Sequence, residues 1–377
     1  MSTSSQETLN AMALTRVSHS PTAVLLHLYR MLGSASAIVD HRNHIEDVIP
    51  GASPKLKESL SNLDNALRRA AEELEYDQRY GIQVLTPADD RYPQRLRECD
   101  DAPLVLYYKG SANLNARRVI NIVGTRKCTV YGQDLIRRFI EELHLRCPDI
   151  LIVSGLAYGV DIHAHRQALH NGFETVAVLA HGLDEIYPPR HRDTAVKMLS
   201  QGGLLTEHMT RTNADKINFV RRNRIVAGMS DACVLVESAA HGGGLITARL
   251  SRDYNRDVFA FPGRIDDMYS EGCNNLIRDN GAQLLTSADD LLRAMGWQND
   301  QQLAEAQQSG IERQLFPDLS PDEQTIVNSL QQQNDQQINM LSVATNIPVY
   351  QLTAILFEME MKGVVRTMAG GIYHLLQ

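Results

Sequence analysis

The chain has 377 residues, 43% of them hydrophobic, and a formal net charge of -8. At roughly 100–200 residues per domain, this length suits two or three domains. No run approaches the ~20 consecutive apolar residues of a transmembrane helix, and the polar start is unlike a signal peptide, so we expect a cytoplasmic protein. The 5 cysteines form no CxxC pair, which argues against a disulfide framework and a structural zinc site.

The negative charge is unevenly distributed. Residues 296–377 hold nine acids and three bases, a net charge of -6, which leaves only -2 for residues 1–295. A ligand responds to the local field rather than to the total charge. The acidic total therefore does not exclude binding of nucleic acid.

The N-terminal region reads as helical. Residues 1–15 lack apolar periodicity, and we expect a flexible tail there. Within 16–80, Leu25, Leu28 and Leu32 recur at helical spacing before Gly33, and further helices are predicted over 35–39, 53–63 and 67–80. This predicts a small all-α domain of the helix-hairpin-helix or SAM-like kind. Such domains clamp a DNA backbone or contact partners, and both interpretations stay open.

Residues 81–296 change to a βα alternation. Extended segments in 81–115 lead into it. Short apolar runs are separated mostly by helix-length segments and predict strands at 119–123, 150–154, 175–179, 204–207, 232–237, 258–261 and 283–285. Near-continuous apolar runs indicate strands buried on both faces. The predicted fold is α/β, an extended Rossmann-like, doubly wound parallel sheet.

Polar residues over 297–315 predict a linker, and a last domain is predicted over 316–377. Ser320 and Glu323 form a capping box, and a later helix precedes a β-hairpin, which is the plan of a winged helix. Its predicted third helix, 348–362, carries Glu358 and Glu360 against one lysine. These charges oppose entry into a DNA groove and favour protein contact or self-regulation.

Glycines follow several predicted strands, at the edge where open parallel sheets bind ligands. Glycine there lets a phosphate approach the backbone, and three such loops in one sheet predict a phosphate-lined crevice. The candidate residues of these loops are Gly124, Thr125, Arg126, Gly155, Gly159, Gly243, Gly244 and Thr247. The chain has no P-loop and no G-x-G-x-x-G after the first strand, so no nucleotide cofactor is predicted.

One basic stretch, residues 216–224, holds four cations and no acid. Cations follow phosphates, and an exposed aromatic ring stacks an unpaired base, so this composition indicates single-stranded nucleic acid. The alternative is that the aromatic residue is core and the cations form a solvated helix face. The candidate residues are Lys216, Phe219, Arg221, Arg222, Asn223 and Arg224.

No catalytic or metal site is predicted. His163 and His165 lie two residues apart, so on a helix they diverge by about 200° and cannot easily share an ion. Glu237 at a strand end could activate water, which leaves a nucleotide-hydrolysing enzyme acting on a small phosphorylated ligand as the alternative function. We favour a structural role, as an acceptor for backbone amides or for Arg224.

Six motifs resemble the DNA-processing protein A family, DprA/Smf. They are Gly124-Thr125-Arg126; Ser154-Gly155-Leu156-Ala157-Tyr158-Gly159-Val160-Asp161; Tyr187-Pro188; Phe219 with Arg222-Asn223-Arg224-Ile225-Val226-Ala227-Gly228; Gly244-Leu245-Ile246-Thr247-Ala248; and Phe261-Pro262-Gly263 with Gly272-Cys273-Asn274-Asn275-Leu276-Ile277. The resemblance runs from the helical region through the C-terminal domain.

The resemblance implies a homodimer that binds single-stranded DNA, protects incoming strands and loads RecA during natural transformation, with no known catalytic activity. By position, Arg126, Lys216 and Phe219 match the family's DNA-contacting residues. Val220 stands where many members have proline, and Gly243 stands where many have serine.

Overall fold

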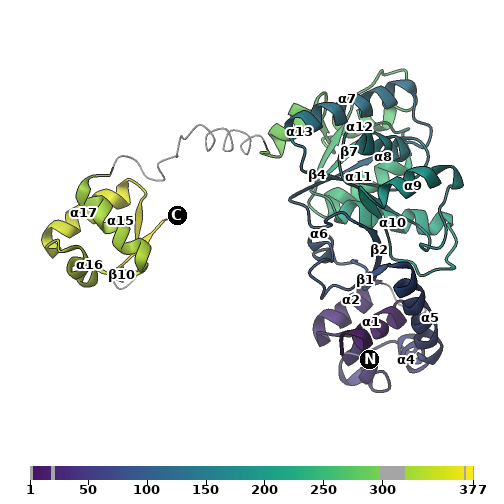
Figure 1. Cartoon of the computed structure of the whole chain (residues 1–377), viewed down its shortest axis with the longest axis horizontal. Helices are drawn as coiled ribbons and strands as arrows, with labels where there is room; N and C mark the ends of the chain where they lie inside the picture. The colour runs from purple at the N-terminus through teal and green to yellow at the C-terminus, as the bar shows by residue number, and fades with distance from the viewer. Residues whose placement is uncertain (1–2, 18–21, 298–318, 369–370, 377) are drawn as a thin grey trace. The chain divides into compact units, whose positions relative to one another are not determined.

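The computed structural model describes residues 3–17, 22–297, 319–368 and 371–376, in two compact units, Met1–Trp297 and Gln298–Gln377 (Figure 1). No single described helix is long and apolar enough to cross a membrane; Ile338–Thr345 and Val349–Met361 reach that length and apolarity only as a pair, bent by 106°. Except for residue 297, the expected linker over 297–315 lies outside the described residues.

The first unit begins with an all-α region. Its elements are α1 (Thr3–Leu14), α2 (Thr22–Leu32), α3 (Ala35–Asp40), the 3-10 turn η1 (Ile45–Asp47), α4 (Pro54–Ser61) and α5 (Asp64–Tyr80). The side chains of Ser34 and Ser53 accept backbone N–H bonds and start α3 and α4, as serine does at helix N-caps. α2 to α5 lie where the apolar spacing predicts helices.

Helix α1 corrects the expected flexible tail over 1–15. Met12 and Leu14 are fully buried, and α1 packs against α3 and α5. The Glu7 carboxylate also accepts the N–H groups of Ala35 (2.6 Å) and Ser36 (2.9 Å) at the start of α3. The second half of α1 is surrounded by other helices, so its apolar residues show no amphipathic period.

The α/β part is built on a sheet whose nine described strands follow the order β1-β2-β6-β5-β4-β3-β7-β8-β9. The strands are β1 (Gln83–Leu85), β2 (Leu106–Gly110), β3 (Arg118–Val123), β4 (Ile150–Ser154), β5 (Thr175–Val178), β6 (Gly202–Thr206), β7 (Ala232–Leu235), β8 (Asp257–Ala260) and β9 (Gln283–Leu284). β3 to β9 are parallel, which confirms the doubly wound sheet.

Helices cover both faces of this sheet. The connections contain α6 (Gln94–Arg97), α7 (Val130–Arg146), α8 (Val160–His170), η2 (Pro189–His191), α9 (Arg192–Met198), α10 (Lys216–Gly228), α11 (Gly243–Asp253), α12 (Glu271–Arg278) and α13 (Ala288–Ala294). Along β3, Ile120 and Ile122 join the core of α7, α8 and α13, whereas Val119 and Val123 join the core of α10 and α11. This alternation is the side-chain period of a strand.

Strands β1 and β2 extend the sheet rather than merely leading into it. β2 pairs antiparallel with β6, and β1 pairs antiparallel with β2. The helical region lies beside this edge, and α5 contacts β1 (Figure 1). Covering the edge with helices removes an exposed row of backbone groups from solvent.

The second unit is a winged helix. Its described elements are α15 (Pro321–Gln332), β10 (Gln336–Gln337), α16 (Ile338–Thr345), α17 (Val349–Met361), β11 (Val365–Met368) and β12 (Ile372–Leu375). The capping box forms as predicted: the Ser320 hydroxyl accepts from the Glu323 N–H, and the Glu323 carboxylate accepts from the Ser320 N–H. Leu330, Leu341 and Leu356 are fully buried in a core of its own.

Candidate nucleic-acid interface

The loops after β3, β4 and β7 meet at the carboxyl edge of the sheet. The Thr125 N–H donates to the Glu237 carbonyl (2.7 Å), and the Val160 N–H donates to the Thr125 carbonyl (3.1 Å). β4 and β7 flank β3, so this rim marks the point where the chain passes from one half of the sheet to the other. Open α/β sheets bind ligands at this position.

Protein atoms occupy the space beside the glycines of the second loop. A Cβ on Gly155 would lie 2.2 Å from Arg222 Nη1, and one on Gly159 would lie 2.1 Å from the Thr125 carbonyl oxygen. Gly159 also has a φ of 76°, which side chains with a Cβ rarely adopt. We expected these glycines to make room for phosphate; the structure corrects this, because the loops themselves need the space.

Of the other candidate glycines, two are also crowded by protein atoms and one is not. A Cβ on Gly124 would lie 2.6 Å from the Val160 side chain, and one on Gly244 would lie 3.0 Å from the Gly124 Cα. Gly243 differs: it is exposed at the start of α11, with no atom within 4 Å of its Cβ position. It is therefore the candidate glycine with open space beside it.

The structure brings the predicted cation and aromatic residues together at the start of α10. The Arg126 guanidinium lies 5.0 Å from the centre of the Phe219 ring, and the Tyr187 ring centre lies 5.8 Å from the same point. Arg126 and Lys216 are exposed, Tyr187 is 45% exposed, and Phe219 is half-buried. The Asp215 carboxylate caps α10 by accepting the Asn218 N–H (2.7 Å). This group offers charge and flat apolar surface side by side.

Arg222 is not available to a phosphate. Its side chain is buried, and Nη1 donates to the carbonyls of Gly155 (2.7 Å) and Val178. Burial lowers the pKa of this guanidinium to about 10, so it stays charged at neutral pH, and the nearby Asp161 carboxylate favours that charge. The predicted phosphate contact is corrected: Arg222 ties the loop after β4 to the end of β5.

Of the remaining candidates, two are buried, one is half-buried and one faces a different side of α10. Arg224 is 9% exposed and donates to the Glu207 carboxylate, and Thr247 is buried in α11. Asn223 is half-buried, and Arg221 is exposed and lines a cavity away from the aromatic group. The expected phosphate contact of Arg224 is corrected, because the side chain forms a buried ion pair.

Glu237 serves as a structural acceptor. Its carboxylate accepts the Thr129 N–H (2.8 Å) and the Thr129 hydroxyl (2.5 Å), which holds the start of α7 against the end of β7. A Cβ on Gly132 would lie 2.2 Å from Glu237 Oε2, so α7 approaches closely. The sequence left open backbone amides or Arg224 as the donor; the donors are on Thr129, whereas Arg224 pairs with Glu207.

On α8, His163 is half-buried. His165 is fully buried, and its Nδ1 lies 2.7 Å from the Thr175 hydroxyl. Burial lowers its pKa to about 3, so it is neutral. Within the described residues, no group of three or more His, Cys, Asp or Glu side chains is placed to hold a metal ion.

Two exposed tyrosines beside the site received no role from the sequence. Tyr158, in the loop after β4, is 41% exposed and packs edge-on against the buried His191 (5.0 Å between ring centres). Tyr187 adjoins Phe219. Both belong to motifs that carry the family resemblance, and aromatic residues in polar loops are the signal that would have singled them out.

Comparisons with known proteins agree with this architecture. Residues 83–296 match the family described as DNA recombination-mediator protein A, and residues 312–371 match the DprA winged helix domain. The chain belongs to the DNA recombination-mediator protein A family. Among curated relatives of this family, the putative DNA processing protein DprA of Mycobacterium tuberculosis H37Rv is 36% identical over 296 residues, which cover 75% of this chain and 74% of that protein.

Two solved DprA structures resemble the fold. The X-ray structure of DNA processing protein A from Streptococcus pneumoniae has a TM-score of 0.64 at 32% identity and covers 74% of this chain and 95% of that one. A Helicobacter pylori DprA structure, whose title describes a single-stranded DNA binding mode, has a TM-score of 0.51 at 27% identity and covers 57% and 95%. The sequence resemblance to DprA/Smf is thus confirmed.

Proposed function

We propose that this DprA-family chain binds single-stranded DNA at the carboxyl edge of its sheet and acts there as a recombination mediator. The observation that carries the proposal is the group formed by Arg126, Phe219 and Tyr187 beside the exposed Lys216. Aromatic faces stack unpaired bases, and neighbouring cations follow the backbone. The H. pylori DprA structure, whose title describes a single-stranded DNA binding mode, supports the same class of ligand for this chain.

Binding requires an exchange at Phe219. In the free protein the Arg126 guanidinium lies over the ring, an interaction worth about 0.5–1 kcal/mol at an exposed site. A base stacked on an aromatic ring contributes about 1–3 kcal/mol. The exchange is therefore favourable when the guanidinium leaves the ring for the phosphate of the same nucleotide.

A homodimer through the α/β part is the second element of the proposal. β9 is the last described strand of the sheet, and Leu284 on it is 52% exposed. Ile265 is 90% exposed and Met268 is 61% exposed on the loop after β8. Exposed apolar residues beside an open edge favour association. Light scattering of wild type and Leu284→Glu tests this, because the wild type should be a dimer and the variant should associate less. A monomeric wild type would contradict the proposed homodimer.

For the winged helix we propose contact with protein rather than with duplex DNA. Lys362 is the one lysine of the predicted third helix, 348–362, and it pairs with Glu323 (2.6 Å). The Glu360 carboxylate accepts the Thr367 N–H (2.8 Å). Glu358 adds a further negative charge to the same helix. A cationic face for phosphates is thus lacking on described helix α17. Protection of incoming strands and RecA loading during transformation complete the proposed role.

The deciding experiment is fluorescence anisotropy of a labelled oligo-dT and of a duplex of equal length, at two salt concentrations. We expect wild type to prefer the single strand, with a loss of about 0.7 log units of affinity per log unit of salt for each neutralised phosphate. Arg126→Ala should weaken binding, and Arg293→Ala, which changes an exposed arginine on α13, should not. Equal binding of both DNAs, or an Arg126→Ala variant that binds like wild type, would contradict the proposal.

RecA loading is tested next, by the rate at which RecA forms filaments on oligo-dT already coated with a single-strand-binding protein. Wild type should raise that rate, and Arg126→Ala should raise it less. A rate that does not depend on the protein would restrict its role to DNA binding.

A further inference from the structure

A polar cavity lies between the helical region and the α/β part. Its volume is about 960 Å³. Residues 15–17, which follow α1, and the start of α2 line one side, and α10 with the segment after β6 lines the other. Among its polar lining residues are Arg16 on the helical side and His208, Asn218, Arg221 and Arg224 on the α/β side.

The wall of this cavity presents donors without partners. Arg16 and Arg221 are exposed, and neither has an ion pair among the described residues. Arg224 Nη1, a donor, lies buried in the wall without a hydrogen-bond partner, and so does His208 Nε2, which donates or accepts according to the tautomer of the ring. Unpaired buried donors are costly, and a ligand oxygen relieves that cost.

The two acids in the same wall already have donors. Glu207 accepts from Arg224, and Asp101 accepts the Tyr254 hydroxyl (2.6 Å). With Arg16, Arg221 and Arg224 against these two acids, the formal charge of the lining is +1 in a chain whose net charge is -8. This combination suits an anionic ligand that carries many oxygen atoms, such as a phosphate backbone.

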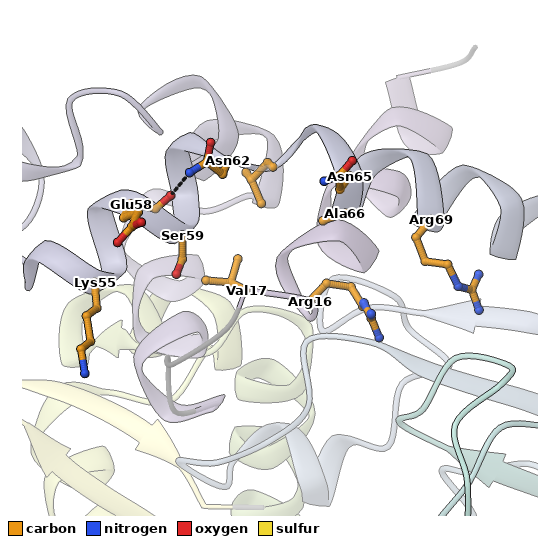
Figure 2. Close-up of a pocket in the computed structure, with 10 residues that line it drawn as sticks. Arg16, Val17, Lys55, Glu58, Ser59, Asn62, Asn65, Ala66 and Arg69 are labelled. Atoms are coloured by element: carbon orange, nitrogen blue, oxygen red, sulfur yellow. Dashed lines mark hydrogen bonds between the residues drawn. The ribbon is translucent and has the colours of Figure 1, made fainter.

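Arg16 also faces a smaller cavity of about 450 Å³ within the helical region. Figure 2 shows Lys55 of α4, Asn62 directly after α4 and Arg69 of α5 around it, with one acid, Glu58. Lys55 is exposed and has no ion pair among the described residues. Cations thus continue from the large cavity onto the helical surface.

One exposed turn of α10 joins the large cavity to the Phe219 group. Each helical residue turns about 100°, so Arg221 lies about 200° around the helix from Phe219. The residues between these directions face solvent: Val220 is 45% exposed and Ile217 is 61% exposed. A strand stacked at Phe219 can therefore cross this exposed turn to reach Arg221.

The position of the helical region is held by polar contacts that range from buried, at Glu73, to exposed, at Arg30. Arg69 donates to the Thr210 carbonyl (2.8 Å), and the Glu73 carboxylate accepts the Thr210 N–H (2.6 Å). On the α2 side, Arg30 donates to the carbonyls of Arg97 (2.7 Å) and Cys99 (3.0 Å). Both walls of the large cavity are therefore held together within one compact unit.

We propose that this cavity is a second subsite for the same single strand, where Arg16 and Arg221 hold phosphates that follow the nucleotide stacked at Phe219. The helical region then extends the DNA path beyond the sheet edge. This inference rests on the proposed function, because the strand must first bind at Phe219.

The test is a length series of oligo-dT, from about 4 to about 16 nucleotides, against the full chain. Arg16→Ala should bind the shortest oligonucleotide like wild type but the longest about tenfold more weakly, with a salt slope smaller by about 0.7. Arg16→Glu should show a larger loss with the same length dependence. Arg79→Ala, an exposed arginine on α5 outside both cavities, is the matched control.

The outcomes separate the two proposals. If wild type binds no oligonucleotide of any length, the proposed function fails and this subsite fails with it. If wild type binds but Arg16→Ala weakens all lengths equally or none, the subsite alone is overturned. Arg16-dependent binding of dTMP with a length series that does not respond to Arg16→Ala also overturns it, because the cavity would then hold a free nucleotide.

Discussion

The Arg126 guanidinium lies 5.0 Å from the centre of the Phe219 ring, although 93 positions separate the two residues in the sequence. The loop after β3 carries the cation, and the first turn of α10 carries the ring. The pairing keeps both groups at the carboxyl edge of the sheet, where we propose that a nucleotide binds.

Phe219→Ala and Arg126→Ala should have different effects on single-strand binding. Loss of the ring removes stacking worth about 1–3 kcal/mol, reduced by the cation–π contact that no longer has to be broken. The salt dependence should change little. Arg126→Ala should weaken binding and also flatten the salt slope, because a phosphate contact is lost. Anisotropy titrations at several salt concentrations measure both. If Phe219→Ala and wild type bind the single strand with equal affinity, no base stacks on Phe219.

Arg222→Ala should destabilise the fold. It leaves the carbonyls of Gly155 and Val178 without their donor and leaves Asp161 buried without its nearby positive charge. Breaking a buried charged contact of this kind costs about 3–5 kcal/mol. The neighbouring exposed Arg221→Ala should unfold like wild type. Thermal or denaturant unfolding of the pair measures the difference, and an Arg222→Ala variant as stable as wild type would show that the buried bonds contribute nothing.

Glu237→Gln should lower stability by about 1–3 kcal/mol, because the amide nitrogen of glutamine cannot accept the bond that Thr129 donates to the carboxylate. Glu185→Gln, at an exposed position, is the control. Both variants are also incubated with a nucleoside monophosphate and with NAD. Turnover by wild type that Glu237→Gln abolishes would favour the nucleotide-hydrolysing alternative over the structural role.

Asp77 makes the stability of the protein depend on pH. The residue is 1% exposed, its carboxylate has no hydrogen-bond partner among the described residues, and burial, reinforced by Glu73, raises its pKa from 3.8 to about 8. Between these values the native state binds more protons than the unfolded state, so the free energy of unfolding falls as pH rises, by up to about 1.4 kcal/mol per pH unit.

Asp77→Asn should remove this dependence. The variant and wild type should be similar near pH 4, and the variant should be the more stable at pH 8. Denaturant unfolding between these pH values measures the difference. A wild-type stability that rises over the same interval relative to Asp77→Asn would show that Asp77 is ionised in the native state.

Much of the α/β part could be predicted from local pattern. The strand predicted at 150–154 is β4, Ile150–Ser154, because a strand buried on both faces appears as an apolar run between polar helices. Helix α1 could not be predicted in this way. Its buried residues are enclosed on several sides by α3 and α5, and such contacts leave no period in the sequence.

The sequence by itself determined the sheet, the winged helix, the family and the basic stretch at 216–224, since each depends on residue type and short spacing. Only the tertiary structure decided which of those cations meet solvent. Arg221 and Arg222 are adjacent, yet one is exposed and the other is buried. Successive helical residues point about 100° apart, and the side that is buried depends on carbonyls supplied by Gly155 and Val178, far away in the sequence.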